Sequence, residues 1–178
     1  MTDRVMIDIE TLGREPGCVV VSIGAVEFGS DGLGEEFFVE IAPASSQEFG
    51  LEIDAETLQW WLTQGEAARE QLIGGDDLDT ALEAFAAWLP DDAEVWANSP
   101  SFDCEILDAA FAAVGEPTPW QWYNQRDVRT VKNFDAAPDI EQDGIEHNAL
   151  DDAIYQARLV AETLDRIGEF DDDCHTRR

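Results

Sequence analysis

The spacing of apolar residues changes along this chain, and the order of the change limits the folds that it can adopt. Three runs rich in β-branched and aromatic residues come first, at residues 5–9, 18–28 and 35–41. Their composition predicts strands, and the turn residues from Gly29 to Gly32 predict an antiparallel hairpin between the last two. In the rest of the chain apolar residues recur at helical spacing, with short strand-like runs between them. This order predicts an α/β fold in which helices flank a mixed sheet.

Residues suited to helix capping precede several helical segments. Asp54 is expected to cap the first helix, and either Asp76 or Asp77 the second. A third helix is expected to begin near Asp103, and the last is expected over residues 150–168. Each segment has an apolar stripe on one side, so each helix is expected to pack against the sheet.

The remaining segments complete the predicted sheet. They are two short strands at residues 94–97 and 120–123, a short helix at residues 125–132, and loops at residues 43–50 and 135–146. The two strands bring the sheet to five. The length predicts one domain, over residues 1–168, followed by a disordered acidic tail over residues 169–178.

The charge of the chain is extreme. It has 40 acidic and 10 basic residues, for a formal net charge of −30. Such a surface repels itself at low salt, whereas at molar salt the Debye length is about 3 Å and the repulsion is screened. The charge therefore predicts a salt-adapted protein, from a halophilic archaeon or a virus of one. A protein whose carboxylates mimic DNA phosphates is the alternative.

Other features of the composition bear on location. No apolar run approaches the ~20 residues of a membrane span, and the N-terminus does not resemble a signal peptide. Cys18, Cys104 and Cys174 are widely spaced, which favours unpaired thiols in a reducing compartment. A cytoplasmic protein with no membrane partner is expected.

Two acidic residues, Asp8 and Glu10, stand two positions apart in the first predicted strand. Side chains two apart in a strand point to the same face, so these carboxylates would lie side by side. Val5, Ile7 and Ile9 would face an apolar layer on the other side. Because the chain is so acidic, Asp8 and Glu10 taken alone are also compatible with the solvent-exposed face of an edge strand.

Two further polar segments stand just before helices. Asp103 would lie at a helix N-terminus, where a carboxylate is favoured, although a plain capping role fits it equally well. His147 precedes the last helix, and Asn148 with Asp151 reads as a capping box. Asp152 lies off the apolar stripe of that helix, so its periodicity predicts a solvated side chain.

Together these segments resemble the three motifs of the DEDDh 3′–5′ exonucleases. D-x-E lies in the first strand, N-x-x-x-F-D runs from Asn98 to Asp103, and H-x-A-x-x-D runs from His147 to Asp152. Three segments are most similar to a small branch containing phage-type exodeoxyribonuclease A and a mycobacterial 3′–5′ exoribonuclease: residues 8–13, 21–25 and 126–130. The resemblance implies an RNase H-like fold with a mixed five-stranded sheet.

The resemblance also implies a chemistry. Carboxylate ligands of this kind suit two ions of Mg²⁺ or Mn²⁺. By the resemblance, Asp8, Glu10 and Asp152 hold one ion, and Asp8 and Asp103 hold the second. His147 matches the general base for the attacking water, a role that suits imidazole because it exchanges protons near neutral pH. The expected product is a nucleoside 5′-monophosphate.

Six residues are expected to bind the substrate: Thr11, Leu12, Asn98, Phe102, Trp60 and Arg129. The family's counterparts of Thr11 and Leu12 contact the terminal nucleotide. Phe102, Trp60 or Trp61 would stack on a base, although Trp61 also lies on an apolar stripe and fits the core. Arg129 forms a cationic cluster with its neighbours Arg126 and Lys132, which favours a phosphate contact.

The predicted function is a two-metal 3′–5′ exonuclease acting on single-stranded DNA or RNA 3′ ends. A catalytically silent module that binds nucleic-acid ends and an acidic DNA-mimic inhibitor are the alternatives. The presence of both His147 and Asp152 argues against the silent module. The preference for DNA or RNA stays open, because backbone groups can read the 2′-hydroxyl. The resemblance is compatible with a homodimer.

Overall fold

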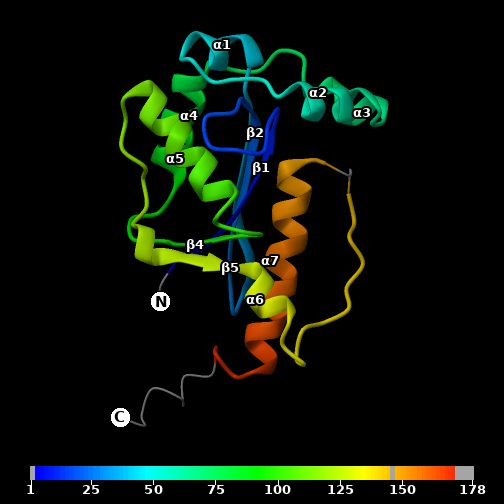
Figure 1. Ribbon diagram of the computed structural model, residues 1–178. Helices are drawn as coiled ribbons and strands as arrows, with labels where there is room; N and C mark the ends of the chain where they lie inside the picture. Colours follow the sequence, from blue (N-terminus) through cyan, green and yellow to red (C-terminus); the bar gives the residue numbers. More distant parts are fainter. Residues whose placement is uncertain (1–2, 145–146, 171–178) are drawn as a thin grey trace.

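β1 (Arg4–Thr11) is the middle strand of a five-stranded mixed sheet with the order β3-β2-β1-β4-β5. The computed structural model describes residues 3–144 and 147–170 (Figure 1). β2 (Val20–Gly29) pairs antiparallel with both β1 and β3 (Gly32–Glu40). β4 (Glu94–Ala97) runs parallel to β1, and β5 (Gln125–Asp127) runs parallel to β4.

Helices cover both faces of this sheet. The helices of the described residues are α1 (Pro43–Glu48), α2 (Ala55–Leu62), α3 (Glu66–Glu70), α4 (Leu78–Trp88), α5 (Asp103–Val114), α6 (Val128–Lys132) and α7 (Ala149–Arg166). Figure 1 shows α4 and α5 on one side of the sheet and α7 on the other. The predicted RNase H-like arrangement of a mixed five-stranded sheet flanked by helices is confirmed.

The side chains of β1 divide between the two faces. Val5, Ile7 and Ile9 are buried in the larger apolar cluster, which also contains residues of α4 and α5. Met6 is buried in the second cluster, beneath α7. Because side chains alternate along a strand, Asp8 and Glu10 share the face of Met6. The alternation predicted from the sequence therefore places both carboxylates under α7.

Several local predictions are confirmed. The hairpin between β2 and β3 closes at Gly29 and Gly32. The Oδ1 atom of Asp54 caps α2 by accepting a hydrogen bond from the Thr57 backbone N–H, with an N···O distance of 2.7 Å. Asn148 caps α7 through two backbone N–H groups of its first turn.

The position predicted for the fifth strand is wrong. Residues Trp122–Asn124 form a 3₁₀ turn, and the strand that pairs with β4 is Gln125–Asp127. The apolar side chain of Trp120 suggested a strand at this position. In the structure its ring is buried edge-on against Phe85 and Phe111. Its apolar character therefore reflects core packing before the strand begins.

The predicted loop at residues 43–50 is also wrong in part. Pro43 opens α1, and the hydroxyl of Ser45 accepts a hydrogen bond from the Leu78 backbone N–H at 2.9 Å. That bond supports the start of α4, whereas the side chain of Asp77 makes no capping bond there. Both α1 and α3 are too short for an apolar period to reveal them.

Part of the predicted tail, residues 171–178, lies outside the described residues, as do Cys174 and His175. Cys18 and Cys104 are buried free thiols. Among the helices of the described ranges, none has the length and apolar character needed to cross a bilayer.

Candidate active site

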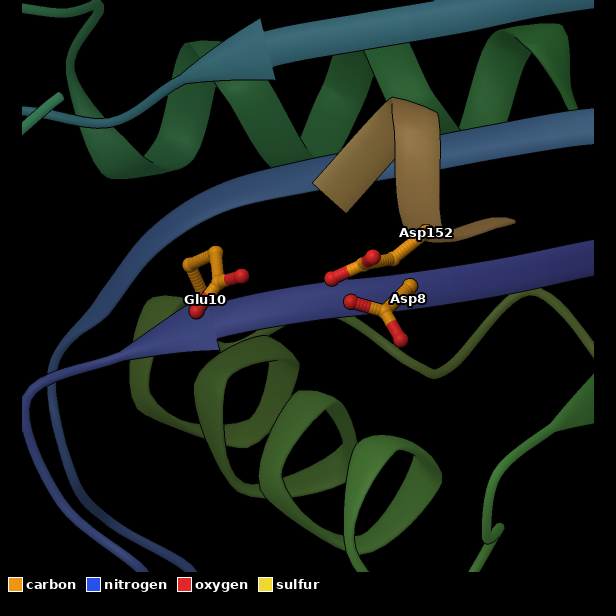
Figure 2. A group of neighbouring side chains, drawn as sticks. All are labelled: Asp8, Glu10 and Asp152. Atoms are coloured by element: carbon orange, nitrogen blue, oxygen red, sulfur yellow. The ribbon is translucent and has the colours of Figure 1, made fainter. Parts of the chain in front are cut away.

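Three carboxylates meet between β1 and α7. Figure 2 shows Asp8 and Glu10 on β1 and Asp152 reaching down to them from α7. One oxygen of each carboxylate lies within 4.8 Å of an oxygen of both others. Carboxylate oxygens at this spacing can share one divalent cation, for which oxygen is the preferred ligand type. The side chains of all three are partly accessible, so a cation can reach them.

A glycine in the neighbouring strand allows this meeting. Gly24 of β2 is the residue paired with Asp8 across the antiparallel ladder. A Cβ atom at Gly24 would lie 2.2 Å from both the Ala149 carbonyl carbon and the Leu150 backbone nitrogen. The first turn of α7 therefore rests directly on the backbone of β2, which brings Asp152 down to β1. A glycine within a strand pattern is the sequence signal of such a close approach.

The structure corrects the sequence-based prediction for Asp152. Its periodicity predicted a solvated side chain, yet the carboxylate is half-buried and accepts a hydrogen bond from the Gln142 side-chain amide. The apolar stripe of α7 identifies the side that faces the second core cluster. It does not reveal that the end of the helix lies against other polar residues.

Asp103 is buried at the first position of α5, with 3% of its surface exposed. It is not one of the three residues whose oxygens meet within 4.8 Å, but its charge raises the pKa of Asp8. Hydrogen bonds from its own backbone N–H and that of Ile9, and the charge of Arg129, each lower the pKa of Asp103. Burial outweighs them and raises that pKa to about 7.

The mutual repulsion of these carboxylates appears in the other two pKa values. Burial, followed by the charges of Asp103, Glu10 and Asp152, raises the pKa of Asp8 well above its ordinary value. Burial and the charges of Asp152 and Asp103 raise the pKa of Glu10 to about 8. A hydrogen bond from Nε2 of Gln156 to Oδ1 of Asp8, 2.8 Å long, acts in the opposite direction. Such a cluster requires protons or cations, so its residues fit divalent metal ions.

His147 lies against α2. Its imidazole is edge-on to the rings of Trp60 and Trp61, with centroid distances of 4.7 Å and 6.2 Å. Its backbone carbonyl accepts a hydrogen bond from Nε2 of Gln71 at 2.7 Å. Sequence reasoning missed Gln71 and Gln156, because single buried amides leave no periodic pattern.

A cavity of about 520 Å³ adjoins the carboxylates at the end of β1. Its lining residues are Ile9, Glu10, Thr11, Gly13, Arg14, Glu56, Thr57, Trp60, Trp61 and Phe102. Glu10 therefore belongs to both the cavity and the acidic cluster. The walls of the cavity combine three aromatic side chains with polar and charged ones, a mixture found in sites that bind small organic groups.

The six residues expected to bind substrate divide between three environments. Thr11, Trp60 and Phe102 line the cavity. Leu12 is 2% exposed and belongs to the larger core cluster. Asn98 and Arg129 do not line the cavity, and Nη2 of Arg129 donates a hydrogen bond of 3.4 Å to the Asn98 carbonyl. Trp61, the alternative stacking residue, is buried and donates from Nε1 to the Thr11 carbonyl at 2.9 Å.

Comparison with known proteins identifies a family and a fold. The family model described as "3′-5′ exoribonuclease Rv2179c-like domain" matches residues 3–164. No curated protein sequence matches the chain significantly. Among solved structures, the nuclease domain of 3′hExo, a DEDDh family member bound to rAMP, aligns with a TM-score of 0.64 and 14% identity. The alignment covers 94% of each chain.

Two other nucleases share the fold. Exonuclease I of E. coli, solved with a 5cy-dT13 oligonucleotide, aligns with a TM-score of 0.64 and 16% identity. The alignment covers all of this chain and 44% of exonuclease I. Cell-death related nuclease 4 (CRN-4) aligns with a TM-score of 0.59 and 12% identity, over 94% of this chain and 65% of CRN-4. At these identities the likeness concerns the fold.

Proposed function

Because the chain belongs to the Rv2179c-like 3′–5′ exoribonuclease domain family and is a DEDDh-type 3′–5′ exonuclease, we propose that it releases nucleoside 5′-monophosphates from single-stranded or frayed 3′ ends. The observation that supports this proposal is the meeting of Asp8, Glu10 and Asp152 oxygens within 4.8 Å, beside buried Asp103. We assign this activity to residues 1–168.

Two divalent ions, Mg²⁺ or Mn²⁺, are the proposed cofactors. Asp8, Glu10 and Asp152 would hold one ion, and Asp8 with Asp103 would hold the other. Bound in this way, such ions supply charge neutralisation and orient the attacking and leaving oxygens of a phosphodiester. Burial raises the pKa values of Asp8, Glu10 and Asp103, and the charges of neighbouring carboxylates add to the shift for Asp8 and Glu10. These raised values support the assignment, because bound cations favour the ionised carboxylates.

His147 is the proposed general base. A ring nitrogen of its imidazole accepts a proton from the attacking water, whose oxygen forms the new bond to phosphorus. The bond from phosphorus to the 3′-oxygen of the preceding nucleotide breaks, and that oxygen takes up a proton. The chain is thereby shortened by one nucleotide and keeps a free 3′-hydroxyl.

The cavity beside Glu10 is the proposed site for the terminal nucleoside. Its volume of about 520 Å³ and the rings of Trp60 and Phe102 suit a base with its sugar. Stacking on an aromatic side chain is worth ~1–3 kcal/mol per base and does not depend on sequence. Arg129, which lies close enough to act on Asp103, is the proposed contact for a backbone phosphate.

The net charge of −30 supports a second element of the proposal, activity at high salt. Phosphate contacts weaken as salt rises, so binding would depend on bound metal ions and on stacking. We expect the hydrolysis rate and the melting temperature to increase from low to molar KCl. A melting temperature that falls with KCl would remove the basis for salt adaptation.

The test is hydrolysis of end-labelled DNA and RNA single strands in molar KCl, with Mn²⁺ or with EDTA. Metal-dependent release of mononucleotides from the 3′ end is expected from the wild-type protein. Asp8→Asn and His147→Ala should each abolish most of it, whereas Gln121→Met, at an exposed position, should not. A folded wild-type protein that hydrolyses neither strand in any of these conditions contradicts the proposal. The ratio of the two rates gives the preferred nucleic acid.

A further inference from the structure

We propose that Gln71 and Trp60 are positioning residues, which together fix the imidazole of His147 beside the nucleoside cavity. This inference rests on the proposed function of His147. According to this inference, the segment formed by α2, α3 and Gln71 holds His147 in position, in addition to α7.

The backbone at His147 needs external support. Its φ angle is +61°, in the left-handed region that residues with a side chain seldom adopt. Asn148, the next residue, already caps α7 and so fixes the chain on the C-terminal side. Such a conformation persists where surrounding contacts determine it. Among the described residues, Gln71 and the two tryptophans of α2 provide such contacts.

Gln71 holds the main chain of His147. It follows α3 directly, only 6% of its surface is exposed, and its Nε2 donates to the His147 carbonyl at 2.7 Å. Its Oε1 atom is buried and accepts no hydrogen bond among the described residues. A buried amide that uses half of its capacity is costly compared with an apolar side chain of the same length. The bond to His147 is the interaction that accounts for an amide at this position.

Trp60 and Trp61 hold the ring. Trp61 is 1% exposed and fixed to β1 through its hydrogen bond to Thr11. Trp60 packs edge-on against Trp61 and is 43% exposed, since it also lines the cavity. One face of α2 therefore contacts both the imidazole and the space proposed for the terminal base.

The kinetic test uses Gln71→Met, which keeps the length of the side chain and removes the hydrogen-bond donor. We expect kcat to fall about ten- to a hundredfold, because a misplacement of about 1 Å can cost 10²-fold. KM and the Mn²⁺-dependent rise in melting temperature should stay within twofold of wild type, since neither the cavity nor the carboxylates change. Gln121→Met, at an exposed glutamine, is the matched control.

A double-mutant comparison separates positioning from a general loss of structure. In a His147→Ala background, Gln71→Met should cause little further loss, because the residue it positions is gone. Losses that multiply in the double variant would overturn the proposal, as would a wild-type kcat in Gln71→Met. If His147→Ala alone retains full activity, the proposed role of His147 fails instead, which is a different result.

A spectroscopic measurement tests the same proposal without activity. The chain has two histidines, so His175→Ala leaves the imidazole of His147 as the single histidine signal in a proton NMR spectrum. Ring currents of the two indoles should displace that signal, and Gln71→Met or Trp60→Leu should return it towards the position of a free histidine. A signal that stays in place in both folded variants overturns the proposal. Should Gln71→Met fail to fold, Gln71→Glu removes the same donor at pH values where the carboxylate is ionised.

Discussion

Gln156 donates a hydrogen bond from Nε2 to Oδ1 of Asp8, one helical turn beyond Asp152 on α7. The same helix thus supplies one carboxylate of the cluster and orients another. The bond favours the ionised form of Asp8, because a hydrogen-bond donor stabilises a carboxylate. Gln156 is 6% exposed, so water does not readily replace it.

The first prediction concerns metal affinity. Gln156→Met removes the donor while keeping the length of the side chain. We expect the Mn²⁺ concentration needed for half of the thermal stabilisation to rise about 10–100-fold, the usual effect of losing a group that orients a metal ligand. The measurement is the melting temperature against Mn²⁺ concentration, with Gln121→Met as control. An unchanged titration curve would mean that Asp8 is oriented by its backbone alone.

The second prediction concerns Gly24. A Cβ atom there would lie 2.2 Å from the backbone of α7, so Gly24→Ala must displace the helix and Asp152 with it. We expect a loss of about 1–3 kcal/mol in the free energy of unfolding, as for overpacked sites, together with loss of metal-dependent stabilisation. Gly29→Ala on the same strand is the control, since its Cβ meets nothing within 4 Å. Equal behaviour of the two variants in urea unfolding and metal titration would contradict this account.

The third prediction concerns pH. The pKa of Glu10 is raised from 4.5 to about 8, so between these values the native state keeps a proton that the unfolded chain has lost. The contribution of Glu10 to the free energy of unfolding of metal-free protein should therefore fall as pH rises through this window, and be constant below it. The pKa of Asp103, raised from 3.8 to about 7, acts in the same direction.

Melting temperatures in EDTA and molar KCl over this pH range check the prediction. Glu10→Gln should flatten the dependence, because it removes one titrating group, and should raise the melting temperature at the alkaline end. Mn²⁺ should stabilise the wild-type protein more as pH rises, since it binds the ionised carboxylates. A metal-free stability that increases over the window would show that the carboxylates are ionised in the native state without metal.

The fourth prediction concerns Arg129. Arg129→Gln should raise KM for a single strand about two- to fivefold, within the ~0.2–1 kcal/mol that an exposed charged contact contributes. The effect should be larger at low salt than at molar KCl, because screening weakens it. Arg166→Gln, at the other end of α7 from Asp152, is the control. Equal KM changes in both variants would indicate a general charge effect and no contact at Arg129.

The two carboxylates of β1 and the caps of α2 and α7 were predictable from sequence, because each depends on spacing within one element. Asp8 and Glu10 follow from the alternation of β1, and Asn148 from its place before a helical period. The meeting of β1 with α7 depends on Gly24, whose meaning appears only when α7 is seen against it. Gln71 lies outside every period, so its role could not be predicted from sequence.

The position of the fifth strand was predicted wrongly for a related reason. Trp120 is a core residue that packs against Phe85. In the sequence, the aromatic residues at positions 120–123 have the composition expected of a strand. The true strand, Gln125–Asp127, is polar and short, and it is defined by its pairing with β4. Pairing between distant segments is a property of the folded chain, so local residue patterns do not reveal it.

The carboxylates that meet at the end of β1 come from β1 and α7, the first and last elements of the described residues. During synthesis, Asp8 and Glu10 leave the ribosome long before Asp152, and all five strands of the sheet precede α7 in the chain. A growing polypeptide therefore lacks the complete acidic cluster until α7 has been synthesised. Because of this order, a chain interrupted before Asp152 has the two carboxylates of β1 but lacks the third.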